Sequence, residues 1–150
     1  MEKLTKEFSP LLTRYGLGVK DRQELFEIII DQLIEKRALP VDFRAKTIEA
    51  LEEREKKLST AVGNRLALPH ASVEGIPHVL TAAVKTAEEI DYQAPDHQGV
   101  DFFFLVLIPK DEYSTHLRAI ASVSQFFRDE AVMQSIQAAG SEADLSQCFL

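Results

Sequence analysis

Residues 100–108 read VDFFFLVLI, and this run from Val100 to Ile108 decides the fold class. It is almost continuously apolar, with Asp101 as its one charged residue, and Pro109 follows it directly. A run of this length that is rich in aromatic and β-branched residues predicts a strand buried on both faces, as in the centre of a sheet. We expect the strand to end at the proline.

Shorter strand patterns precede the central run. They span Ser59–Val62, Leu66–Leu68 and Val79–Val84. Turn-forming residues separate these segments, namely Gly63-Asn64, Gly75, Pro77, Pro95 and Gly99. Residues 59–109 therefore predict a sheet of several short strands around one long strand.

Two helices are expected before the strands. Residues 21–37 place apolar side chains at helical spacing. Asp21 is the expected N-cap, and Glu24 would complete a capping box. A second, more highly charged helix is expected over residues 41–57, just after Pro40.

Further helices are expected after the strands. One covers residues 116–128 and would be capped by Ser114 or Thr115. A short helix covers residues 131–138, and Ser141 opens a last helix that runs to the C-terminus. This order of elements predicts an α/β fold in which helices flank a small mixed sheet.

The composition excludes several classes of protein. The chain has 150 residues, of which 45% are hydrophobic and 27% charged, and its net charge is −7. We expect one globular domain over residues 1–150, with no nucleic-acid partner because nucleic-acid binders collect Lys and Arg. No apolar run reaches the roughly 20 residues that span a bilayer, so no direct membrane insertion is expected. With Cys148 as the single cysteine, no internal disulfide can form. The expected location is the cytoplasm.

His70 is the first candidate for chemistry, because imidazole can be a nucleophile, a base or a ligand near neutral pH. It follows the short apolar segment at 66–68 and Pro69, whose ring restricts the backbone beside it. A histidine held in this way has a defined direction. Spacing alone leaves an equal alternative, a loop histidine without a role.

His116 and Arg54 are the next candidates. His116 is expected at the start of a helix, where free N–H groups and the helix dipole attract anions. Arg54 lies shortly before His70, and arginine binds phosphate through two N–H groups while keeping its charge. The alternatives are an exposed first-turn histidine and a surface arginine paired with a glutamate.

The other reactive side chains favour structural readings. His78 and His97 are expected in turns without a role, and Cys148 as a small core residue. No two histidines have the i, i+2 or i, i+4 spacing that is typical of zinc ligands, so no metal site is expected. The chain also lacks a Walker-type phosphate loop, a G-x-S-x-G elbow and an H-E-x-x-H pair.

Read together, these residues match a known signature. Residues 54–70, REKKLSTAVGNRLALPH, resemble the pattern of the type-2 IIA domains of the bacterial phosphoenolpyruvate-dependent sugar phosphotransferase system, which is roughly R-E followed by S-T-x-x-G-x-G-[IV]-A-[ILV]-P-H. The resemblance continues in DHQGVD at 96–101 and in Thr115-His116-Leu117. It covers nearly the whole chain and is closest to the nitrogen-regulatory IIA proteins, beside the mannitol and fructose IIA proteins.

The resemblance implies a fold, a role and a set of site residues. The fold is a mixed sheet sandwiched between helices. The role is that of a phosphotransferase-type phosphohistidine carrier without metal or organic cofactor. His70 would accept a phosphoryl group from the phosphocarrier HPr or its nitrogen-branch counterpart. His116 would hydrogen-bond that group, and Arg54 would stabilise its charge. A IIB domain, or a regulated transporter or kinase, would be the downstream partner.

One departure from the pattern bears on the role. Arg65 stands where the family usually has glycine, so that the motif reads G-N-R instead of G-x-G. Arg65, with Asn64 beside it, could add a contact to the phosphate, or Arg65 could crowd the face on which the donor docks.

Three functions therefore stay open. The first is a regulatory phosphocarrier of the nitrogen-regulatory kind, and the second is a sugar-specific IIA component of the fructose or mannitol type. The third is a non-catalytic IIA-like sensor or binding module associated with a membrane transporter, in which His70 never carries phosphate. Exposure to phosphorylated HPr would separate the third from the first two.

Overall fold

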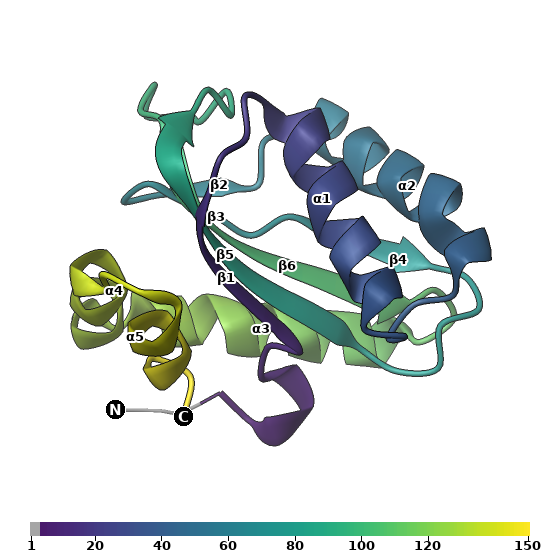
Figure 1. Cartoon of the computed structure of the whole chain (residues 1–150). Coiled ribbons are helices and arrows are strands. Elements are labelled where there is room, and N and C mark those ends of the chain that lie inside the picture. The colour runs from purple at the N-terminus through teal and green to yellow at the C-terminus, as the bar shows by residue number, and fades with distance from the viewer. Residues whose placement is uncertain (1–3) are drawn as a thin grey trace.

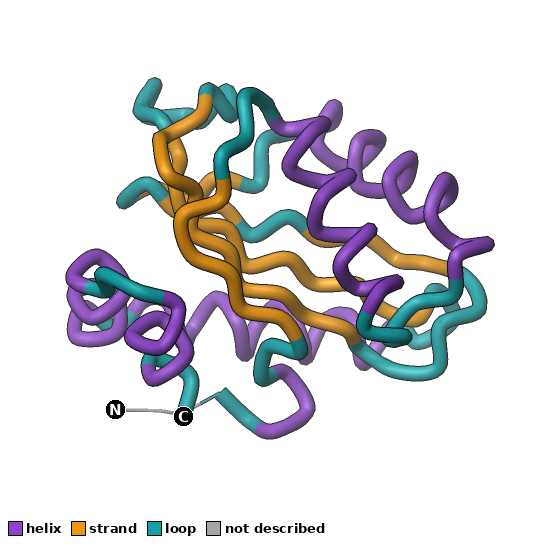
Figure 2. The backbone as a smooth tube through the Cα atoms, in the orientation of Figure 1, coloured by secondary structure: helices purple, strands orange, loops and turns teal. Residues whose placement is uncertain are grey.

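The apolar run forms the central strand of a mixed sheet. The computed structural model describes residues 4–150, and in it β6 (Val100–Pro109) has neighbours on both edges. β5 (Leu80–Ile90) pairs with it antiparallel along one edge. The other edge is shared in parallel by β3 (Leu66–Ala67) and β4 (His70–Val73). Figures 1 and 2 show this sheet running through the middle of the molecule.

Two further strands complete the sheet. β1 (Leu12–Leu17) pairs in parallel with β5, and β2 (Ala61–Gly63) pairs antiparallel with β3. The order across the sheet is β1-β5-β6-β3-β2, with β4 beside β6 off this path. Both parallel and antiparallel pairs are present, so the sheet is mixed as expected.

Helices cover both faces of the sheet (Figure 1). One face carries α1 (Arg22–Glu35) and α2 (Arg44–Lys57), and the other carries α3 (Tyr113–Arg128), α4 (Glu130–Ala138) and α5 (Glu142–Gln147). Two short 3₁₀ turns, Lys6–Phe8 and Val41–Phe43, complete the elements.

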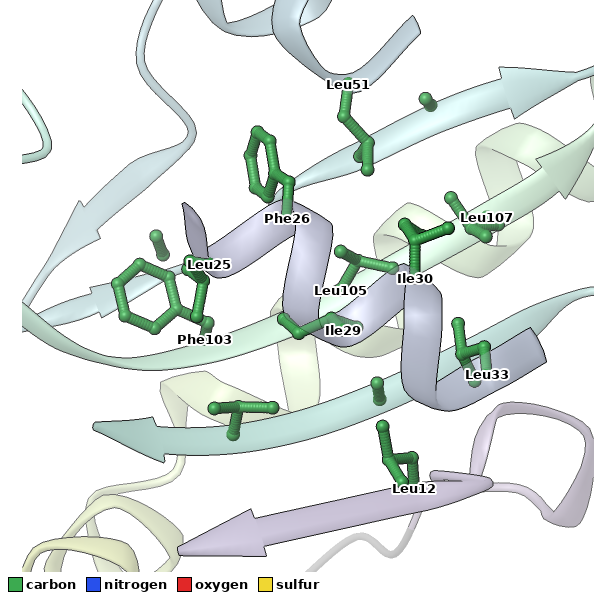
Figure 3. Packing of buried hydrophobic residues seen from close by; sticks show 14 of the residues in the cluster. Leu12, Leu25, Phe26, Ile29, Ile30, Leu33, Leu51, Phe103, Leu105 and Leu107 are labelled. Carbon is green, nitrogen blue, oxygen red and sulfur yellow. The ribbon is translucent and has the colours of Figure 1, made fainter. Parts of the chain in front are cut away.

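β6 supplies both cores, because successive side chains of a strand point to opposite faces. Phe103, Leu105 and Leu107 pack toward α1 and α2, while its other alternate residues pack toward α3 and α4. Figure 3 shows the first core, in which side chains of α1 meet those of β6. Burial on both faces explains why this strand reads as an unbroken apolar run.

The expected fold class, a mixed sheet between helices, is confirmed. The sequence reading missed two strands, however. β1 was assigned no element, because residues 12–17 mix apolar, polar and charged side chains and lie at an edge. His70 was placed at the end of a strand, whereas it begins β4. Pro69 interrupts one strand, and its carbonyl then accepts the N–H of Val106, which starts the next ladder (2.9 Å).

The helix boundaries agree to within a few residues, with two corrections. The Asp21 side chain accepts the N–H of Glu24 as expected (2.9 Å), but the Glu24 carboxylate accepts the N–H of Lys20 and does not complete the box. The cap expected for α3 at Ser114 or Thr115 is wrong, because the helix begins at Tyr113 with no side-chain cap. No helix within residues 4–150 is both long and apolar enough to cross a membrane.

Candidate functional site

His70 is held at the first position of β4 with one ring nitrogen occupied. Its Nδ1 lies 2.8 Å from the carbonyl oxygen of Leu68. A carbonyl only accepts hydrogen bonds, so in the neutral ring Nδ1 carries the proton and Nε2 carries the lone pair. Because Pro69 lies between the two residues, the bond spans a stiff turn. The hydrogen bond therefore leaves Nε2 as the ring nitrogen with a free lone pair.

His116 lies beside His70, although 46 positions separate them in the sequence. The two ring centroids are 6.1 Å apart, with the rings nearly perpendicular. His116 is in the first turn of α3, and its Nδ1 lies 3.2 Å from the hydroxyl of Ser72. The expected pairing of these two histidines at one place is therefore present in the structure.

Ser72 is a site residue that sequence reasoning missed. Residues 70 and 72 point to the same face of β4, since side chains alternate along a strand. Ala71 and Val73 point to the opposite core beneath α1 and α2. In a strand, residues two positions apart share a face, so the spacing of His70 and Ser72 could have indicated this contact. That inference requires residues 70–73 to be recognised as a strand.

The surroundings of His70 favour its neutral form. Burial is the largest cause and lowers the pKa of His70 below its ordinary value of 6.5. The positive charge of Arg54 and the ring of His116 lower this pKa further, whereas the bond to Leu68 and the charge of Glu55 oppose the shift. A neutral imidazole has a free lone pair and can act as a nucleophile, and the surroundings of His70 favour this form.

Arg54 extends from the last turns of α2, a helix that packs on β4. One of its terminal nitrogens donates a hydrogen bond of 2.6 Å to the carbonyl of Leu58. Its guanidinium forms no ion pair with any carboxylate of residues 4–150. Arg54 therefore brings an unneutralised positive charge, with further N–H donors, into the neighbourhood of His70.

Arg65 is placed differently. It lies in the two-residue turn between β2 and β3, where Asn64 and Arg65 both have positive φ angles of 54° and 64°. Its guanidinium lies 3.1 Å from the carboxylates of both Glu89 and Asp101. Asn64 is exposed at the same turn. The structure thus brings Arg65 together with acidic residues of β5 and β6, and its side chain has two carboxylates to neutralise it.

The remaining candidates lie apart from this cluster. His78 and His97 are exposed in turns, and Cys148 packs partly buried against the core, where burial raises the pKa of its thiol. Within residues 4–150, no group of three or more His, Cys, Asp or Glu side chains could hold a metal ion.

Three large apolar side chains are exposed on segments near the candidate residues in the sequence. Leu58, Val62 and Leu117 have 66%, 58% and 53% of their surface exposed. A cleft of about 650 Å³ lies between the β2–β3 hairpin and helices α3 and α4, and Leu66 and Leu68 form part of its wall. Neither His70 nor His116 lines this cleft.

Comparisons with known proteins place this chain in a family. Residues 8–150 match the family described as phosphoenolpyruvate-dependent sugar phosphotransferase system, EIIA 2. The chain is similar to a nitrogen regulatory protein homolog of Haemophilus influenzae, at 30% identity over 149 residues that cover 98% of this chain and 90% of the relative. It is also similar to a fructose-specific EIIA component of Haloferax volcanii, at 28% identity over 121 residues that cover 81% and 77%.

A solved structure agrees with these matches. The crystal structure of nitrogen regulatory protein IIA-Ntr from Neisseria meningitidis superposes with a TM-score of 0.81 at 26% identity, over 96% of this chain and 97% of that one. The match to the family model extends over almost all of the chain and includes every element that builds the site. The chain therefore belongs to the EIIA type-2 family of the phosphoenolpyruvate-dependent sugar phosphotransferase system.

Proposed function

We propose that the chain is a regulatory phosphocarrier that accepts a phosphoryl group on Nε2 of His70. The observation that carries the proposal is the bond of 2.8 Å between His70 Nδ1 and the Leu68 carbonyl, which leaves Nε2 as the nucleophile. The family of the chain supports the reaction class, since its members work with phosphotransfer partners such as HPr and IIB domains.

The reaction is a direct displacement at phosphorus. The lone pair on Nε2 of His70 forms the new bond to phosphorus as the bond to the donor's nitrogen breaks, and that electron pair returns to the donor imidazole. The Nδ1 proton stays on His70, hydrogen-bonded to Leu68. Transfer to a downstream protein is the same displacement in reverse, so no cofactor takes part.

Two neighbours would stabilise the charge on the transferred group. Arg54 supplies a positive charge and N–H donors that no carboxylate of the described chain neutralises. His116 supplies a ring nitrogen from the first turn of α3, where the helix dipole also favours an anion. Groups of this kind, aimed at charge that develops in the transition state, account for much of the rate of such transfers.

The exposed apolar residues fit a docking role. We define the apolar rim as the exposed residues Leu58, Val62 and Leu117. Leu58 directly follows α2, which carries Arg54; Val62 is in β2; and Leu117 follows His116 in α3. We assign the phosphoryl donor, HPr or its nitrogen-branch counterpart, to this rim. The acidic balance of the chain, −7, suits a donor with a basic docking face.

The nitrogen-regulatory branch is the better supported of the two carrier functions. The relative named as a nitrogen regulatory protein homolog covers more of this chain than the fructose-specific component does, 98% against 81%, at slightly higher identity. The chain would then act in the cytoplasm, with a regulated transporter or kinase as its downstream partner. A fructose-type IIA component is the second candidate, with a IIB domain as its acceptor.

Intact-mass spectrometry after incubation with phosphoenolpyruvate, enzyme I and each HPr in turn tests the proposal. We expect one added phosphoryl group, at mildly alkaline pH, that is absent in His70→Ala. Faster loading by the nitrogen-branch HPr than by the sugar-branch HPr supports the regulatory function, and the opposite preference supports the sugar-specific one. No added mass with active donors favours the non-catalytic binding module.

A further inference from the structure

Glu55 is a buried carboxylate next to the candidate arginine, and no chemistry is yet assigned to it. Its side chain is 5% exposed and forms no ion pair within the described residues. The carboxylate instead accepts the N–H of Thr60 (3.1 Å), the Thr60 hydroxyl and the Tyr92 hydroxyl (2.7 Å). A buried charge is costly unless hydrogen bonds compensate it, so these three bonds are what keep Glu55 in place.

The bonds of Glu55 continue to His70 through the backbone. The carbonyl of Thr60 accepts the N–H of Leu68 at 3.0 Å, and the carbonyl of Leu68 accepts the Nδ1–H of His70 at 2.8 Å. Glu55 fixes Thr60, Thr60 fixes Leu68, and Leu68 sets which nitrogen of His70 is free. A continuous chain of hydrogen bonds therefore links the buried carboxylate to the candidate nucleophile.

The same loop also holds Arg54. The Leu58 carbonyl, two residues before Thr60, accepts the hydrogen bond of the Arg54 guanidinium. Ser59 between them donates its hydroxyl to the backbone carbonyl of Tyr92 at 3.1 Å. The segment 58–60 is thus pinned from two sides, by α2 and by the segment that follows β5.

We infer that Glu55, with Thr60 and Tyr92, is a positioning residue for phosphoryl transfer. It fixes His70 Nε2 and the Arg54 guanidinium relative to each other, although it touches neither the phosphoryl group nor the donor. This inference rests on the proposed function of His70. Its physical basis is that a displacement of about 1 Å in a transfer site can cost 10²-fold in rate.

Two matched threonine variants separate positioning from stability. Thr60→Val removes the hydroxyl that bonds Glu55, and Thr81→Val removes another buried hydroxyl, which bonds the carbonyls of Phe8 and Ser9 and takes no part in the chain of hydrogen bonds from Glu55 to His70. Both variants lose buried hydrogen bonds, so both destabilise the fold. We expect Thr60→Val alone to lower the maximal rate of phosphoryl transfer, by about tenfold or more, with an unchanged half-saturating donor concentration.

Two more variants extend the test. Glu55→Gln keeps the shape of the side chain but removes its charge, and we expect it to slow transfer at least as much as Thr60→Val. Tyr92→Phe keeps the ring against Phe103 and removes only the hydroxyl, so a smaller loss, of a few fold, is expected. If Glu55→Gln does not fold, Thr60→Val and Tyr92→Phe decide the result.

The tautomer of His70 gives a readout that does not depend on transfer. Nitrogen chemical shifts of the imidazole in the unphosphorylated protein are expected to show the Nδ1–H form in the wild type and in Thr81→Val, and a mixture of tautomers in Thr60→Val. If the wild type accepts phosphate on His70 while Thr60→Val and Glu55→Gln transfer as fast as Thr81→Val, the positioning role is overturned. If the wild type never accepts phosphate, the proposed function fails, and the tautomer comparison still decides whether Glu55 places His70.

Discussion

Two arginines, eleven residues apart, flank the same short segment of this protein and have opposite surroundings. Arg54 lies in the last turn of α2, bonds a backbone carbonyl and forms no ion pair with any described carboxylate. Arg65 occupies the β2–β3 turn and lies between Glu89 and Asp101 at 3.1 Å from each. The residue type is the same, but Arg65 has two carboxylates beside it, whereas Arg54 has none among the described residues.

The contacts of the two arginines differ because the local backbone points their side chains toward different partners. The last turn of a helix presents free carbonyls, and a basic side chain there can bond one of them without losing its charge. A tight hairpin turn instead directs Arg65 toward the neighbouring strands, where acidic residues meet it. We therefore assign the phosphate contact to Arg54 and leave Arg65 and Asn64 out of the proposed transfer machinery.

The largest expected effect is that of removing His70, the proposed nucleophile. His70→Ala should abolish phosphoryl acceptance while thermal unfolding stays close to that of the wild type, because His70 is only partly buried. Intact mass and circular dichroism measure the two quantities. Retained acceptance would move the phosphorylation to another residue, first of all His116, and would remove the basis of the comparison.

Next in size is the direct contrast of the two arginines. Arg54→Ala should slow phosphoryl acceptance by about 10²-fold to 10³-fold, the range found when one transition-state donor is removed from an active site. Arg65→Ala, the matched control, should leave the rate within about twofold of the wild type, since its charge is already paired. Rapid-quench measurement of the first turnover checks both, and equal losses in the two variants would refute the distinction.

The pH dependence sharpens the comparison further. Burial and the charge of Arg54 lower the pKa of His70, so neutral His70 should persist, and transfer should continue, below the ordinary histidine pKa of about 6.5. In Arg54→Ala, the acid limb of the rate should move to higher pH, whereas in Arg65→Ala it should not move. Titration of the His70 ring by NMR reports the same shift without the donor.

The same lowered pKa has a consequence for stability. Below about pH 6.5 the unfolded chain binds a proton at residue 70 more readily than the folded chain does. The free energy of unfolding should therefore fall as the pH falls through this range, and His70→Ala should lose that part of the dependence. Denaturant titrations at several pH values, on both proteins, measure the difference.

The smallest expected effect is that of Arg65→Gly. Glycine relieves a left-handed backbone that costs an ordinary residue about 1 kcal/mol. The variant, however, loses the ion pairs with Glu89 and Asp101, worth up to about 1 kcal/mol each, and gains freedom in the unfolded chain. The stability should therefore stay within about 1 kcal/mol of the wild type, with transfer unchanged. A large gain in transfer rate would mean that Arg65 obstructs the donor.

Much of the architecture was predictable because it depends on local pattern. The central strand follows from an apolar run that only burial on both faces can satisfy, and α1 follows from apolar side chains at helical spacing with Asp21 as its cap. β1 was missed, because an edge strand with mixed side chains has no clear periodicity. β4 was missed because Pro69 hides that the chain resumes pairing at His70.

By itself, the sequence determined the central strand, the helices and the fold class, because each depends on apolar patterns within a few positions. The roles expected for His70, His116 and Arg54 came from the resemblance to a family. The tertiary structure alone decided that the ring centroids of His116 and His70 lie 6.1 Å apart, that the Leu68 carbonyl accepts the hydrogen bond of His70 Nδ1, and that Arg65 pairs with Glu89 and Asp101. These facts depend on contacts between segments far apart in the chain. No local pattern records such contacts, because the sheet that brings the segments together forms only in the folded protein.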